Sequence, residues 1–138
     1  MLLATLAVES LETIDVQSFV KSVDEDRLFK TVDKLSSFHT RNSLSPGHKE
    51  ACDWLAGEFA KIPGVKVEVT PYTMPAGRRV PKETAGFQVV ATMTGATDRV
   101  ILMGGHIDSL NLDGDPLTVR APGANDDASG VAATLEAA

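Results

Sequence analysis

An apolar run that ends in a glycine pair, followed at once by a histidine and a carboxylate, constrains this chain more than any other feature. Apolar side chains at successive positions predict a strand over Arg99–Met103 that is covered on both faces. Gly104-Gly105 ends the run, and His106 and Asp108 follow. Alternate residues of a strand point to the same side, so His106 and Asp108 project together if the extended backbone continues past Gly105.

A second acidic motif stands in a turn of small residues. Residues 121–130 read Ala-Pro-Gly-Ala-Asn-Asp-Asp-Ala-Ser-Gly, and an alanine-rich helix is expected over 127–138. Asp126 and Asp127 suit the start of that helix, where carboxylates cap free backbone amides, and Asp127 fits this role in part. Small residues also let the backbone approach a bound ion closely. Gly130 would let the helix pack closely on the sheet.

Together the two motifs contain the donor types that zinc prefers, neutral imidazole and carboxylate. On this interpretation His106 is a ligand, and Asp108 accepts the second ring N–H of His106 and fixes its tautomer. Asp126 can bridge two ions about 3.5–4 Å apart, which together polarise a carbonyl and hold a hydroxide. For the His-x-Asp pair alone, an ordinary polar pair at a strand end is the competing interpretation.

Periodic apolar residues predict two helices upstream. The first spans about 24–37, with acidic residues at its start, where the helix dipole favours negative charge. The second begins with Ser45 as N-cap and Pro46 at the first helical position, and it ends at Pro63-Gly64. Their apolar stripes consist of Leu28, Val32 and Leu35 in the first helix and of Ala51, Trp54, Leu55, Phe59 and Ile62, with Glu58 as the polar edge, in the second.

Apolar and polar residues alternate over 65–70, which predicts a half-exposed strand, and a second strand is predicted over 87–94. The proline-rich stretch 71–84 is expected to be a crossing loop. Two helices, strands and a further helix describe the first part of an α/β sandwich.

Composition narrows the function classes. The 138 residues carry a net charge of −6, which argues against nucleic acid or an anionic membrane surface as partner. No apolar run approaches the roughly 18–20 residues of a membrane span. Cys52 is the only cysteine, so an intrachain disulfide is impossible; a half-buried structural thiol is expected. His39 and His48 are expected to be loop or surface histidines.

Three stretches resemble the co-catalytic di-zinc aminopeptidase family, which includes bacterial leucyl aminopeptidases, glutamate carboxypeptidases and glutaminyl cyclases. Gly105-His106-Ile107-Asp108-Ser109 is similar to its first metal motif, and residues 121–130 are similar to its second. Residues 35–42, Leu-Ser-Ser-Phe-His-Thr-Arg-Asn, resemble its N-terminal helix–loop–helix, and the matching positions that follow are Gly47, Ala51, Trp54 and Leu55. The resemblance covers most of residues 27–138.

The resemblance implies the N-terminal part of a three-layer α/β/α sandwich with a mixed sheet, truncated after the second metal motif. Residues 24–138 would form this incomplete catalytic domain, and 1–23 a segment of uncertain order. His106 would bind one of two zinc ions, Asp126 would bridge both, and Asp108 would support His106. Asn125 stands where relatives often have aspartate, at a position that is not a ligand. The family's Glu-Glu pair, which supplies the general base and a ligand, and its later aspartate and histidine are expected downstream of the last helix.

The function implied is a zinc-dependent exopeptidase, an aminopeptidase in the first instance, that cleaves N-terminal residues from peptides with a two-zinc-activated water. The 138-residue chain alone is expected to be inactive. The alternatives are a metal-free interaction domain on the same fold and cyclisation of N-terminal glutamine. The resemblance favours a secreted or periplasmic location. Met1–Val8 is apolar without a basic start, so it is no complete signal peptide; it fits the trailing end of one or an ordinary N-terminus.

Overall fold

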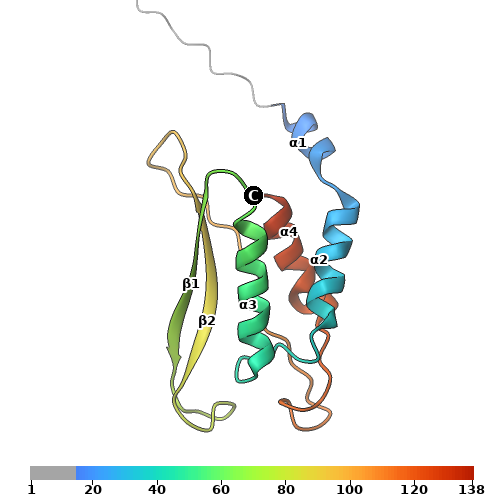
Figure 1. Ribbon diagram of the computed structural model, residues 1–138, viewed down its shortest axis with the longest axis vertical. Helices are drawn as coiled ribbons and strands as arrows, with labels where there is room; N and C mark the ends of the chain where they lie inside the picture. The colour runs from blue at the N-terminus through green and yellow to red at the C-terminus, as the bar shows by residue number, and fades with distance from the viewer. Residues whose placement is uncertain (1–14) are drawn as a thin grey trace, which may run out of the picture.

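A computed structural model describes residues 15–138 of the chain. The signal-peptide interpretation of Met1–Val8 concerns residues outside this described part. The elements run in the order α1 (Val16–Ser22), α2 (Glu25–Ser37), α3 (Pro46–Phe59), β1 (Val65–Met74), β2 (Thr84–Met93), the short turn of helix η1 (Ala124–Ala128) and α4 (Ser129–Glu136) (Figure 1). The α/β class predicted from the sequence is confirmed: the described part holds a two-stranded antiparallel sheet with the helices on one side of it (Figure 1).

The two upstream helices form where their stripes and caps predict them. Asp24 caps α2, because its Oδ1 accepts the backbone N–H of Arg27 at 3.0 Å. Pro46 opens α3, but Ser45 makes no side-chain cap bond; its hydroxyl instead donates to the carbonyl oxygen of Asn42 at 2.8 Å. The last predicted turn of α3 tightens into hydrogen bonds between residues three apart, so the α-helix ends at Phe59 rather than at the proline.

The strands are longer than the alternation of the sequence indicates. β1 continues through Pro71 to Met74, and β2 starts at Thr84, so the expected crossing loop is instead the connection of a hairpin and is shortened to residues 75–83. Their antiparallel register pairs Val65 with Met93 and Met74 with Thr84. Proline is tolerated in β1 because this strand lies at the edge of the sheet, where one side of the backbone needs no ladder partner.

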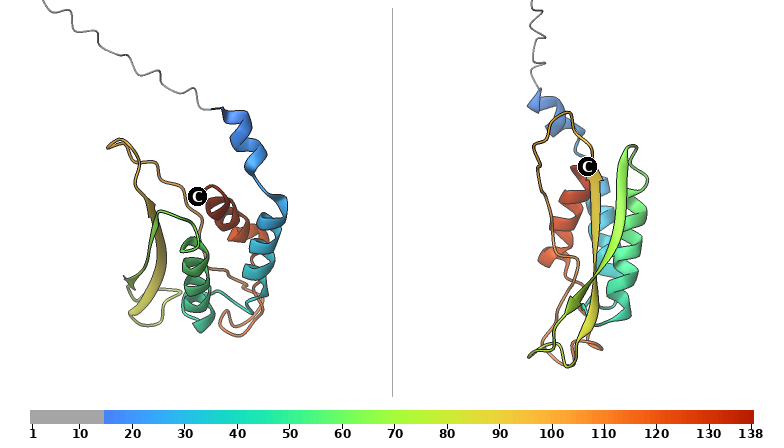
Figure 2. Two further views of the ribbon diagram at one scale, coloured as in Figure 1. Left: turned by 45° about the horizontal axis from the view of Figure 1, so that its top comes forward. Right: turned by 90° about the vertical axis from the view of Figure 1, so that its left-hand side faces the viewer.

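The core lies where α2, α3 and α4 meet behind the hairpin (Figure 2). Val65, Val67 and Val89 of the hairpin pack against this core from the sheet side. Its buried members come from α2, α3, η1 and α4: Leu35, Ala51, Leu55, Phe59, Ala128 and Val131. The predicted apolar stripes of the helices therefore face one another, and the residues that precede α4 are anchored in the same core.

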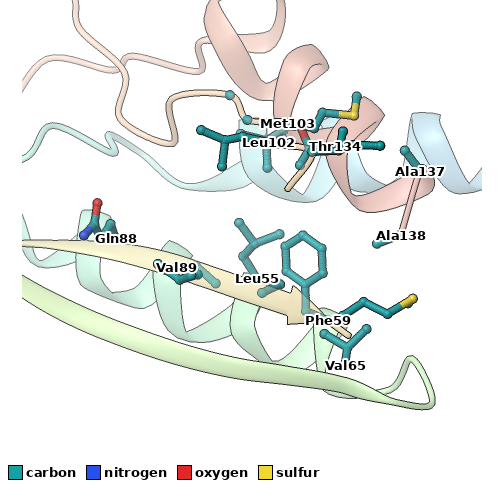
Figure 3. Close-up of a pocket in the computed structure, with 17 residues that line it drawn as sticks. Leu55, Phe59, Val65, Gln88, Val89, Leu102, Met103, Thr134, Ala137 and Ala138 are labelled. Atoms are coloured by element: carbon teal, nitrogen blue, oxygen red, sulfur yellow. The ribbon is translucent and has the colours of Figure 1, made fainter. Parts of the chain in front are cut away.

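The strand predicted over Arg99–Met103 is wrong for the described part of the chain. Residues 99–112 form no strand, and Val100, Ile101 and Leu102 are 88%, 95% and 93% exposed. A strand needs a neighbour for its backbone N–H and C=O groups, and within residues 15–138 the only ladder is that between β1 and β2. A groove of about 480 Å³ separates Leu102 and Met103 from Val89 and α3 (Figure 3).

The expected C-terminal helix begins later than predicted. A π-helical turn, η1, precedes α4. It is closed by a hydrogen bond from the Ala128 amide to the Gly123 carbonyl oxygen at 3.1 Å. Inside it Asp126 and Asp127 have non-helical backbone angles, with φ of −127° and −133°, and the peptide bond between them is cis. The two carboxylates are therefore carried by a bend in front of the helix and not by the helix itself.

In the described residues, none of the helices has the length and hydropathy needed to span a bilayer.

Glu136, the last residue of α4, binds the first turn of α2. Its carboxylate is 8% exposed, accepts from the Arg27 guanidinium, with Nε at 2.9 Å, and accepts from the Asp24 amide at 2.7 Å. The hydrogen bond with Arg27, then that with the Asp24 amide and the charge of Arg27, outweigh desolvation and lower the pKa of Glu136.

Acid is expected to weaken the fold through Glu136. A carboxyl whose pKa is lower in the folded than in the unfolded chain adds stability above its ordinary value of about 4.5, and that stability is lost as the pH falls through the folded pKa. Urea unfolding at pH 7 and pH 3 should show a smaller acid loss in Glu136→Gln than in the wild type. Glu68→Gln, which removes the exposed partner of Lys66, is the control and should keep the wild-type loss. Equal acid losses in Glu136→Gln and the wild type would contradict the assignment.

Candidate metal site

The three predicted site residues come together. His106 Nε2 lies 2.8 Å from Asp126 Oδ1, although twenty positions separate the two residues. On the other side of the ring, His106 Nδ1 lies 3.1 Å from the backbone oxygen of Asp108 and 3.2 Å from its Oδ1. One ring nitrogen therefore faces Asp126 and the other faces Asp108, as the sequence interpretation requires. Whether His106 and Asp126 bind metal stays a prediction.

The acidic surroundings favour a protonated His106 when no metal competes. Desolvation lowers the pKa of His106, but the hydrogen bonds with Asp126 and with the backbone of Asp108, together with the charges of both residues, exceed it and raise the pKa above its ordinary value. A cation at Nε2 would take the place of that proton, and the same carboxylates would stabilise it.

Asp127 connects the two motifs, a role that the sequence interpretation missed. Its Oδ2 accepts the backbone N–H of His106 at 3.2 Å, and its Oδ1 accepts the backbone N–H of Gly130 at 3.1 Å. The expected capping function is thus confirmed for one oxygen, while the other holds the segment that carries the histidine. An acidic residue next to a predicted ligand is the signal that was available, but its partner could not be identified without the fold.

Glycine makes this close approach possible. A Cβ at Gly105 would come within 2.7 Å of the Val131 amide nitrogen and 2.8 Å of the Gly130 carbonyl carbon. A Cβ at Gly130 would collide with the Asp127 carboxylate. The expected close packing at Gly130 is therefore observed, but against Asp127 and the 104–106 segment rather than against a strand.

His48 and Cys52 form a buried pair beneath β2, which corrects the expectation of a surface histidine. His48 is 2% exposed, and its Nε2 lies 3.0 Å from the carbonyl oxygen of Phe87 and 3.9 Å from Cys52 Sγ. Cys52 is fully buried rather than half-buried, and burial, ahead of the charge of Asp53, raises its pKa to about 11. The thiol stays protonated at neutral pH, so it is no activated nucleophile. His39, by contrast, is the exposed loop histidine that was expected.

The chemistry of the donor set fits zinc in part. An imidazole nitrogen and a carboxylate oxygen converge on one point, and a carboxylate oriented toward the second ring nitrogen is the usual support of a metal-bound histidine. Residues 15–138 contain no group of three or more histidine, cysteine, aspartate or glutamate side chains placed to hold a metal ion. The described residues therefore offer two candidate metal ligands, which is fewer than the three or four protein ligands of a complete zinc site.

Comparisons with known proteins agree with this donor set. Residues 88–138, which include both motifs, match peptidase family M28. A probable zinc metalloprotease of Leptosphaeria maculans is 40% identical over 105 residues, which are 71% of this chain and 24% of that protein. A probable leucine aminopeptidase of Arthroderma benhamiae is 34% identical over 134 residues, which are 93% of this chain and 32% of that protein.

The fold has a solved counterpart. The crystal structure of LapB from Legionella pneumophila aligns with a TM-score of 0.65 at 23% identity, over 89% of this chain and 31% of that one. The chain spans about a quarter to a third of the length of the relatives it matches. The resemblance inferred from the two metal motifs and the N-terminal helix–loop–helix is confirmed: the chain is related to the peptidases of family M28.

Proposed function

We propose that this chain contributes the first two metal motifs of a zinc-dependent exopeptidase, an aminopeptidase that acts on the N-terminus of peptides. The observation that carries the proposal is the convergence of His106 Nε2 and Asp126 Oδ1 at 2.8 Å from two separate motifs. The names of the fungal relatives, a probable zinc metalloprotease and a probable leucine aminopeptidase, supply the choice of metal and of reaction.

The residues divide the work as follows. His106 offers Nε2 as a metal ligand. Asp108 accepts a hydrogen bond from the Nδ1–H of the same ring, which keeps the imidazole in the tautomer that leaves Nε2 free. Asp126 is 88% exposed, and within residues 15–138 its Oδ2 accepts no hydrogen bond, so its two oxygens can serve two ions. Zinc, when bound, polarises a scissile carbonyl and lowers the pKa of a bound water.

Zinc is expected to bind the 138-residue chain weakly. Two protein donors leave most of the coordination sphere to water, so the affinity should be far below that of closed four-ligand sites, for which binding contributes about 10–16 kcal/mol. A titration followed by NMR should show shifts at His106 and Asp126. His106→Ala should abolish them, and Asp108→Asn should lower the affinity about tenfold because the histidine loses its support.

Asp113→Asn is the matched control, since Asp113 lies in an exposed loop and, within residues 15–138, makes no hydrogen bond or ion pair with His106 or Asp126. Tight binding that survives His106→Ala would refute the ligand assignment. A chain that binds no zinc at all would instead favour the metal-free interaction domain.

Activity is expected only when further donors are supplied. The 138-residue chain should not hydrolyse a leucyl anilide, because residues 15–138 hold no three-donor metal group. Residues 24–138 grafted in place of the matching part of the Arthroderma benhamiae relative should give hydrolysis that a chelator removes and that His106→Ala or Asp126→Ala abolishes. Chelator-sensitive hydrolysis by the ungrafted chain, or a folded, zinc-loaded graft without hydrolysis, would contradict the proposal.

A further inference from the structure

Arg41 lies in the loop between α2 and α3, and its side chain is fully buried. Its backbone N–H donates to Ser109 Oγ at 2.9 Å, and Ser109 Oγ donates to the carbonyl oxygen of Ala121 at 2.7 Å. The guanidinium donates to four backbone carbonyl oxygens. Nε donates to Ile107 at 2.7 Å, Nη1 to Leu35 at 2.5 Å and to Pro122 at 2.7 Å, and Nη2 to Gly123 at 3.1 Å.

The charge of Arg41 is compensated by carbonyl dipoles. No carboxylate within residues 15–138 lies within ion-pair distance of this guanidinium. Burial lowers its pKa and the charge of Asp108 opposes the change, but an arginine stays protonated in proteins. A buried charge is costly unless its donors are satisfied, so the fold favours an arrangement in which these carbonyl groups stay within hydrogen-bond distance of the guanidinium.

Three of these four carbonyl groups belong to the two metal motifs, and the fourth, that of Leu35, belongs to α2. Ile107 stands between His106 and Asp108, and Gly123 stands three residues before Asp126. The planar guanidinium therefore donates hydrogen bonds to the backbone of both motifs at once. Gly123 has a φ of +51°, and a Cβ there would lie 2.9 Å from Nη2 of the arginine, so this contact requires glycine.

The donors themselves have little packing to hold them. The side chains of His106 and Asp126 are 53% and 88% exposed, and their shared contact is the 2.8 Å approach already described. Their separation therefore depends on how the two backbone segments are placed. Arg41 touches neither donor, but it binds both segments on their buried side.

Building on the proposed function, we propose that Arg41 is the positioning residue of the metal site, and that its guanidinium fixes the spacing of His106 and Asp126 through the carbonyl groups of Ile107, Pro122 and Gly123. Lysine cannot replace it, because an ammonium is a compact donor that does not reach carbonyl groups on three segments at once.

Amide hydrogen exchange of the metal-free 138-residue chain tests this without reference to zinc. The His106 amide, bound by Asp127, reports whether the two motifs are still joined. In Arg41→Lys this amide should exchange at least tenfold faster than in the wild type, while amides in the middle of α3 change less than twofold. Phe59→Ala, which removes buried volume from the last turn of α3, is the control for a general loss of stability. It should accelerate exchange in α3 at least as much as at His106.

The measurements are made with trimethylamine N-oxide, which favours the folded state, so that the variants stay folded. Three results for Arg41→Lys would overturn the proposal: unchanged exchange of the His106 amide, equal acceleration at His106 and throughout α3, or loss of all protection. Each of them means that Arg41 does not act selectively on the two metal motifs.

Zinc titration is the second arm. Arg41→Lys should bind zinc at least tenfold more weakly than the wild type, while Phe59→Ala should stay within twofold. Wild-type affinity in Arg41→Lys would overturn the positioning role. If the wild-type chain binds no zinc at all, the proposed function fails, but the exchange experiment still decides the role of Arg41.

Discussion

Leu35→Ala is expected to lower the free energy of unfolding by about 2–5 kcal/mol, the range for truncating a buried leucine. Leu35 is fully buried where α2 meets Ala51 and Leu55 of α3 and Val131 of α4. Such a loss is a large part of the roughly 5–15 kcal/mol that stabilises an ordinary domain. Urea unfolding followed by circular dichroism measures it.

Leu28→Ala gives the matched comparison. Leu28 lies on the same stripe of α2 but is only half-buried, so the same truncation removes fewer contacts and should cost clearly less. An equal or smaller loss for Leu35→Ala than for Leu28→Ala would mean that the three helices do not share the core described above.

The run from Val100 to Met103 is expected to make the isolated chain associate and bind hydrophobic dyes. Contiguous exposed apolar residues beside an unpaired strand edge promote contacts between chains. The double change Ile101→Lys and Leu102→Lys should reduce both dye fluorescence and the concentration-dependent increase in light scattering several-fold, since two charges are placed in the run.

The matched control adds the same two charges elsewhere. Leu110→Lys with Leu112→Lys alters two exposed leucines of the loop that follows the first motif, and it should leave association close to that of the wild type. A wild-type chain that stays monomeric at all concentrations, melts sharply and binds no dye would show that the exposed run causes no association and that the chain is a self-sufficient domain.

The helices could be predicted because their signals are local. Asp24 and Pro46 mark helix starts whatever lies around them, and the stripe through Leu28, Val32 and Leu35 specifies which face is buried. The two strands were predicted too short, and their connection was predicted as a crossing loop rather than a hairpin, because cross-strand pairing, and not the alternation of single residues, carries β1 through Pro71.

Predictions that depended on distant partners were less successful. The apolar character of 99–103 indicates burial but not the neighbour that must provide it. His48 was expected on the surface because it lies outside the apolar stripe predicted for α3. A second set, His48, Cys52, Leu55 and Phe59, recurs at spacings of four, three and four and faces the sheet; this signal was available. For Arg41 there was none beyond the family resemblance, since its carbonyl partners lie 66 to 82 positions away apart from Leu35.

The bend that carries Asp126 also determines where the second motif can tolerate change during evolution. Gly123 is confined by its positive φ and by the backbone of Asp126, the side chain of Ser109 and the arginine fork, so every other residue type is excluded there. Ala124 and Asn125 are exposed on the outside of the same bend, and their side chains are free of such contacts. Substitutions should therefore be tolerated better at positions 124 and 125 than at Gly123, and an aspartate at position 125 would change the charge beside the site without disturbing the backbone that supports it.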